Sequence, residues 1–118
     1  MAVRSIAILG AGHGGLAAAA DLGARGFEVR LHARRAETLD PIRAQGGIVA
    51  KGVQSGLVPV PLLTTDVAQA VDGADLVMLV VPSVAHEFYA TALAPLMRPD
   101  LAVFVNPGHT GEIGRAHV

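Results

Sequence analysis

A glycine-rich turn near the start of the chain constrains the fold more than any other feature. The apolar residues 6–9 precede it and predict a buried strand, and the alanine-rich stretch that follows predicts a helix. Between them, Gly10, Gly12 and Gly15 have the spacing G-x-G-x-x-G. In this order of strand, turn and helix, the spacing predicts a turn that binds a dinucleotide.

Each glycine of the turn has its own expected role. Gly10 permits the tight turn, Gly12 lacks the Cβ that would keep a pyrophosphate away from the backbone, and Gly15 lets the helix pack closely on the strand. The helix N-terminus offers unpaired N–H groups and a partial positive charge to the phosphates. We expect His13 to contribute its backbone rather than its side chain. The predicted cofactor-binding residues of the turn are Gly10, Ala11, Gly12, His13, Gly14 and Gly15.

The order of apolar and helical patterns predicts the fold class. Predicted strands cover residues 3–9, 28–33, 62–64, 76–81 and 101–105, and predicted helices cover residues 14–25, 36–44, 66–71 and 84–97. Residues 46–61 contain four glycines and two prolines, which indicates a small hairpin or an irregular insertion. The prediction is an α/β fold with a doubly wound parallel sheet of the Rossmann type. We expect this sheet to be incomplete at the C-terminus, because no sixth strand follows. The open edge of the fifth strand then favours a homo-oligomer.

Composition and charge exclude several classes of function. With 118 residues and a net charge of −1, the chain is about one domain and has no basic surface for nucleic acid. Its longest charge-free apolar stretch, residues 76–85, is too short to span a bilayer. It has no cysteine, and no two histidines have the spacing of metal ligands, so we expect no metal site. The prediction is a soluble, cytoplasmic protein that does not act on membranes or nucleic acids.

The end of the second predicted strand bears on the choice of cofactor. NAD-binding domains usually place Asp or Glu there to bind the ribose hydroxyls. Here Ala33, Arg34 and Arg35 follow the strand, and the first carboxylate is Glu37. Arginine attracts the 2′-phosphate of NADP, which an acid would repel. We therefore predict NADP as the preferred cofactor and NAD as the alternative. Arg34 is the expected phosphate contact and Arg35 a candidate for stacking on adenine, unless both are simply solvated charges.

Two further strand ends should lie beside the nicotinamide. Ligands of a doubly wound sheet bind beyond the carboxyl ends of its strands. Beyond the fourth predicted strand the candidate residues are Val81, Pro82, Ser83 and His86, and beyond the fifth they are Asn106, Pro107 and Gly108. His86 could instead pack on the neighbouring loop. We expect His32 to point off an edge of its strand.

Three segments resemble the amino-terminal domain of the octopine and opine dehydrogenases. They are GAGHGGLAAAADLGARG, GADLVMLVVPSVAHEFYATALAPLM and VFVNPGHTGE, which begin at residues 10, 73 and 103. A looser resemblance extends to ketopantoate reductases and bacterial glycerol-3-phosphate dehydrogenases. The resemblance implies a reductive condensation of an amino acid with a 2-oxo acid, with NADH or NADPH as the reductant.

The same resemblance predicts how the chain is organised. We expect residues 1–111 to form the dinucleotide-binding domain and residues 112–118, which read like a translated sequencing adapter, to be a non-native tail. In the resembled family a helical C-terminal domain supplies the catalytic residues and binds the small-molecule substrate. That domain is expected to be absent here, so no catalytic residue is predicted, and whether the fragment alone is an enzyme stays open. The full-length parent is expected to be an NAD(P)-dependent dehydrogenase. A non-catalytic nucleotide-binding or sensor module is the alternative of another class.

Overall fold

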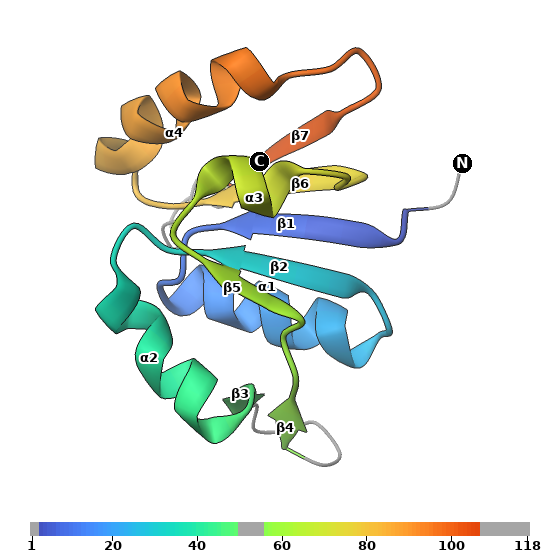
Figure 1. Ribbon diagram of the computed structural model, residues 1–118, viewed down its shortest axis with the longest axis vertical. Helices are drawn as coiled ribbons and strands as arrows, with labels where there is room; N and C mark the ends of the chain where they lie inside the picture. The colour runs from blue at the N-terminus through green and yellow to red at the C-terminus, as the bar shows by residue number, and fades with distance from the viewer. Residues whose placement is uncertain (1–2, 50–55, 107–118) are drawn as a thin grey trace, which may run out of the picture.

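A parallel sheet of five strands runs through the computed structural model, which describes residues 3–49 and 56–106 (Figure 1). The strands lie in the order β5-β2-β1-β6-β7, and every neighbouring pair is parallel. Their bounds are β1 Ser5–Leu9, β2 Glu28–His32, β5 Leu62–Thr64, β6 Leu76–Val80 and β7 Ala102–Asn106. The predicted α/β class and doubly wound sheet are confirmed.

The strand order reverses at β1, which is the centre of the sheet. The chain first builds outward from β1 through β2 to β5, and then crosses over so that β6 and β7 are added on the other side of β1. In such sheets a crevice opens at the carboxyl ends of the strands on either side of the reversal. The topology therefore places the candidate site between the ends of β2, β1 and β6.

Helices cover both faces of the sheet. They are α1 His13–Ala24, α2 Ala36–Gln45, α3 Val67–Val71 and α4 His86–Leu93, with 3₁₀ turns η1 Ser83–Ala85 and η2 Ala94–Leu96. Side chains from α1 and α2 pack with Ile6 and Ile8 of β1 in one core, and side chains from α3 and α4 pack with Ala7 and Leu9 in the other. This alternation is expected for a strand that is buried on both sides. None of the helices among the described residues has the length and apolar character needed to cross a membrane.

The boundaries differ from the sequence prediction by more than one residue in two places, and elsewhere by one residue at most. The first strand begins at Ser5 rather than at residue 3. The predicted helix 84–97 is divided into η1, α4 and η2, and Pro95 lies in η2. Proline has no N–H to donate to the carbonyl four residues earlier, which explains why the α-helix ends before it.

The predicted hairpin is present in part. Strands β3 Ile48–Val49 and β4 Leu57–Val58 pair in antiparallel fashion as a separate two-stranded sheet. Buried Ile48 and Val58 join the core that α1 covers. Strands β3 and β4 therefore contribute to the packing around α1 and form a sheet separate from the parallel one.

Candidate functional site

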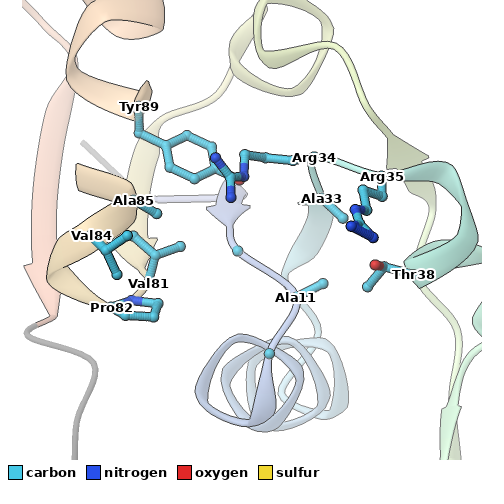
Figure 2. A pocket seen from close by; sticks show the side chains of 12 residues that line it. Ala11, Ala33, Arg34, Arg35, Thr38, Val81, Pro82, Val84, Ala85 and Tyr89 are labelled. Atoms are coloured by element: carbon cyan, nitrogen blue, oxygen red, sulfur yellow. The ribbon is translucent and has the colours of Figure 1, made fainter. Parts of the chain in front are cut away.

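A cleft of about 350 Å³ opens at the carboxyl ends of β1, β2 and β6 (Figure 2). Three segments build it: the glycine turn after β1, the start of α2 after β2, and the turn after β6. The lining residues are Gly10, Ala11, Gly12, Ala33, Arg34, Arg35, Thr38, Val81, Pro82, Val84, Ala85 and Tyr89. The cleft lies where the reversal in strand order predicts a ligand site.

Gly10 and Gly15 are required for packing. Gly10 has a φ of +119°, and a Cβ there would overlap the carbonyl oxygen of Val80. A Cβ on Gly15 would overlap the carbonyl oxygen of Gly10, so this contact fixes the distance between α1 and the turn. Both predicted roles, the tight turn and the close packing of helix on strand, agree with these contacts.

Gly12 is different, because no atom of residues 3–49 and 56–106 fills the space beside it. Its φ of −80° is accessible to any residue, and a Cβ there would have none of those atoms within 4 Å. Gly12 is the N-cap of α1, whose first turn has no side-chain cap and no acidic residue. The N–H groups of that turn are therefore available to an anion, and the space beside Gly12 is open to it.

The opposite wall carries the positive charge. Arg34 and Arg35 follow β2, and both are exposed. The Arg34 guanidinium carbon lies 5.2 Å from the ring centroid of Phe88 on α4. Figure 2 shows Arg34 extending towards Tyr89 on the α4 side, whereas Arg35 stays with Thr38 on the α2 side. The two arginines therefore flank the cleft from different directions.

The position predicted for His32 is wrong. The side chain is fully buried, because β2 is an interior strand and His32 faces α3 and α4 rather than an edge. Its Nδ1 lies 2.9 Å from the hydroxyl of Tyr89, and the two rings meet edge to face. Within the described part of the chain, its Nε2 has no hydrogen-bond partner.

Burial keeps this pair neutral. It lowers the pKa of His32 below the usual value, and the Thr65 backbone and the Asp66 carboxylate offset that shift only in part. Burial also raises the pKa of Tyr89 to about 12, against the opposing charge of Arg34. An uncharged hydrogen bond between β2 and α4 thus lies under the arginine side of the cleft.

Several predicted site residues do not reach the cleft wall. His86 turns back, with its Nε2 3.2 Å from the carbonyl oxygen of Val81. His13, Gly14, Gly15 and Ser83 are also not part of the lining. The backbone of Asn106 ends β7, paired with Val80 of β6, and Pro107 and Gly108 lie outside the described residues, so the site residues predicted at 106–108 stay predictions.

Four lining residues were not predicted. They are Thr38, Val84, Ala85 and Tyr89. Val84 and Ala85 belong to η1, where the sequence pattern predicts the start of one continuous helix, and the turn that Pro82 begins is the signal that could have indicated them. Nothing in the local pattern shows that Tyr89 bonds to His32. In residues 3–49 and 56–106, no group of three or more metal-binding side chains is arranged to hold an ion.

The sequence of the chain is similar to those of known proteins. A family model described as the N-terminus of NAD-dependent glycerol-3-phosphate dehydrogenase matches residues 5–107. The chain belongs to this family. It is 35% identical over 109 residues to an opine dehydrogenase of Arthrobacter sp. (strain 1C), covering 92% of the chain and 30% of that relative. It is 42% identical over 105 residues to a glycerol-3-phosphate dehydrogenase [NAD(P)+] of Moorella thermoacetica, covering 87% of the chain and 30% of that relative.

A solved structure extends the same relationship. A ketopantoate reductase from Ralstonia eutropha JMP134 superposes with a TM-score of 0.68 and 32% identity, covering 85% of the chain and 33% of that structure. The resemblance predicted from the sequence is therefore confirmed: the chain is an NAD-binding domain of this group of oxidoreductases. It spans about a third of the length of the relatives that it matches.

Proposed function

We propose that this domain binds NADP in preference to NAD. The observation that carries the proposal is the charge of the wall after β2, where Arg34 and Arg35 line the cleft and none of the described acidic residues does. Glu37 is exposed in the first turn of α2 and does not line the cleft. An anionic 2′-phosphate is attracted to such a wall, whereas an acid at the same place would repel it.

The remaining walls fit the rest of a nicotinamide dinucleotide. The open space at Gly12, beside the N–H groups of α1, suits the diphosphate. Val81, Pro82 and Val84 give an apolar wall near the switch point, where ring systems are shielded from water. When bound, the cofactor supplies a hydride. The residues of this chain hold and orient the cofactor.

For the parent enzyme, we propose a reductive condensation of an amino acid with a 2-oxo acid. The support is the similarity to the opine dehydrogenase, which extends over 92% of the chain. A glycerol-3-phosphate dehydrogenase is the second candidate, since such a relative is 42% identical over 87% of the chain. A ketopantoate reductase is a third candidate of the same class. Because the chain spans about a third of these proteins, substrate binding and catalysis are assigned to a further domain.

The cofactor preference is tested by titrating the chain with NADPH and NADH and following the nicotinamide fluorescence. We expect NADPH to bind at least tenfold more tightly, and this preference to shrink as salt is added, because charge is its source. The double variant Arg34→Ala/Arg35→Ala should lose the preference. Arg43→Ala is the matched control, because Arg43 is an exposed arginine of α2 that pairs with Asp40 outside the cleft. Tighter binding of NADH than of NADPH by the unsubstituted chain would contradict the proposal.

The substrate is tested with the product of the full reading frame that contains this chain. We expect NADPH oxidation with an amino acid and a 2-oxo acid together, and little with the 2-oxo acid alone, because no imine forms without the amine. Oxidation with dihydroxyacetone phosphate or ketopantoate instead would select the second or the third candidate. Binding of NADPH without oxidation in any of these mixtures would favour a non-catalytic module.

A further inference from the structure

Phe88 contacts Arg34 from outside the cleft. It lies on α4, is 43% exposed and is not one of the lining residues. The Arg34 guanidinium carbon lies 5.2 Å from its ring centroid, inside the range of about 6 Å for a cation–π contact. The ring packs edge to face on buried Tyr89 with a centroid distance of 5.0 Å. The same aromatic side chain therefore contacts both Tyr89 and the arginine.

Among the described residues, Phe88 is the aromatic ring that makes a cation–π contact with Arg34. The ion pairs there involve Arg25, Arg30, Arg43 and Arg98, and neither Arg34 nor Arg35 has a carboxylate within 4.0 Å. Arg34 crosses towards α4, while Arg35 remains on the α2 side with Thr38 (Figure 2). A planar guanidinium has two faces, so an arginine that contacts Phe88 on one face can present the other to a ligand.

We propose that Phe88 is a positioning residue, which holds Arg34 against the α4 side of the cleft so that Arg34 covers the adenine. Arg35 is then the arginine that reads the 2′-phosphate. This assignment rests on the proposed function and exchanges the roles that the sequence suggests for the two arginines. Because adenine is common to both cofactors, Phe88 contributes to the binding of NADPH and of NADH alike.

The test is the dissociation constant of each cofactor for the parent and for Phe88→Leu, which keeps apolar volume but removes the aromatic face. We expect both constants to rise by the same factor of about two to five, the equivalent of one exposed cation–π contact. Phe88→Trp should restore parental affinity for both cofactors, because indole is the better partner for a cation. Arg35→Ala should instead weaken NADPH alone.

Two outcomes would overturn the proposal. Unchanged constants in Phe88→Leu would show that the ring does not position Arg34, and a loss confined to NADPH would make Arg34 the phosphate ligand. A measurement without cofactor separates this proposal from the preference for NADP. In the free chain, the NMR signals of the Arg34 δ-methylene protons should show an upfield ring-current shift that Phe88→Leu removes and Phe88→Trp keeps.

Absence of that shift in the parent would contradict the positioning role, whichever cofactor binds. If the unsubstituted chain prefers NADH, but shows the shift and loses affinity for both cofactors equally in Phe88→Leu, only the proposed preference for NADP is contradicted. If the unsubstituted chain binds neither cofactor, both proposals are contradicted.

Discussion

Two walls of the cleft are built in different ways. The wall after β1 is made of backbone: Gly10 and Gly15 fit against carbonyl oxygens, and Gly12 leaves open space before the amides of α1. The wall formed by the end of β2 and α4 is made of side chains, where the lining residues Arg34 and Tyr89 contact Phe88 and His32 behind them. The first wall uses consecutive residues, whereas the second joins residues 57 positions apart. A wall made of backbone suits the diphosphate, which NAD and NADP share. A wall made of side chains can distinguish the two cofactors by the 2′-phosphate.

The largest expected effect is on the stability of the backbone wall. Gly15→Ala should lower the free energy of unfolding by more than about 3 kcal/mol, because the new Cβ overlaps a carbonyl oxygen that cannot move independently of the turn. Chemical denaturation measures the loss. Gly14→Ala is the matched control in the same helical turn, since its Cβ would meet only the Val80 side chain, at 3.0 Å. It should stay within about 1 kcal/mol of the parent. Equal stability of the two variants would contradict the assigned role of Gly15.

The second prediction separates binding from folding within the same turn. Gly12→Val should weaken cofactor binding by about 100-fold, or about 2.7 kcal/mol, while the domain keeps its fold. The reason is that a Cβ at Gly12 has no atom of the described residues within 4 Å, so the valine side chain starts in the open space of the cleft. Titration with NADPH and a circular dichroism melt provide the two readouts. Gly12→Ala should have an intermediate effect. Parental affinity in Gly12→Val would rule out close approach of a diphosphate to the backbone.

The third prediction tests the side-chain wall for stability. Tyr89→Phe should lower the free energy of unfolding by about 2 kcal/mol, because buried His32 loses its hydrogen bond at Nδ1. Cofactor affinity should change by less than about twofold, because the lost hydroxyl bonds to His32 and not to an arginine. The double variant His32→Phe/Tyr89→Phe removes both polar groups and should recover most of the loss. A double variant less stable than Tyr89→Phe alone would contradict this account.

The smallest expected effect is a pH dependence. Because burial lowers the pKa of His32, the unfolded chain binds a proton below about pH 6.5 that the folded chain does not. The free energy of unfolding should therefore fall as the pH drops below that value, with a slope of at most about 1.4 kcal/mol per pH unit from this one group. Urea titrations between pH 5 and 7 measure it. The double variant His32→Phe/Tyr89→Phe lacks this group and should show a flatter profile. An equal slope in that variant would assign the effect to other groups.

The contrast between the walls also explains what could be predicted from the sequence. The turn and the succession of strands and helices along the chain follow from local signals, because apolar runs and glycine spacing reflect contacts between neighbours in the chain. The arginines were recognised because they follow a predicted strand. The burial of His32 was missed, since whether a strand is interior or at an edge depends on where β5 is added.

The positions of Tyr89 and Phe88 beside the cleft also could not be predicted from the sequence. No periodicity places them opposite β2, because their position depends on the angle at which α4 leaves η1. Likewise, the helix pattern over residues 84–97 could not reveal that its first turn is a 3₁₀ turn lining the cleft. Contacts that depend on two elements distant in sequence require the tertiary structure.

The central position of β1 has a consequence for the order of assembly. Its pairing with β2 joins neighbouring segments, but its pairing with β6 begins with Ile6 opposite Leu76. During synthesis, one edge of β1 must therefore remain unpaired until β6 has left the ribosome. An exposed edge of this kind invites pairing with other chains. Strand β6 thus completes the nucleotide cleft and also closes an edge that the nascent chain would otherwise expose.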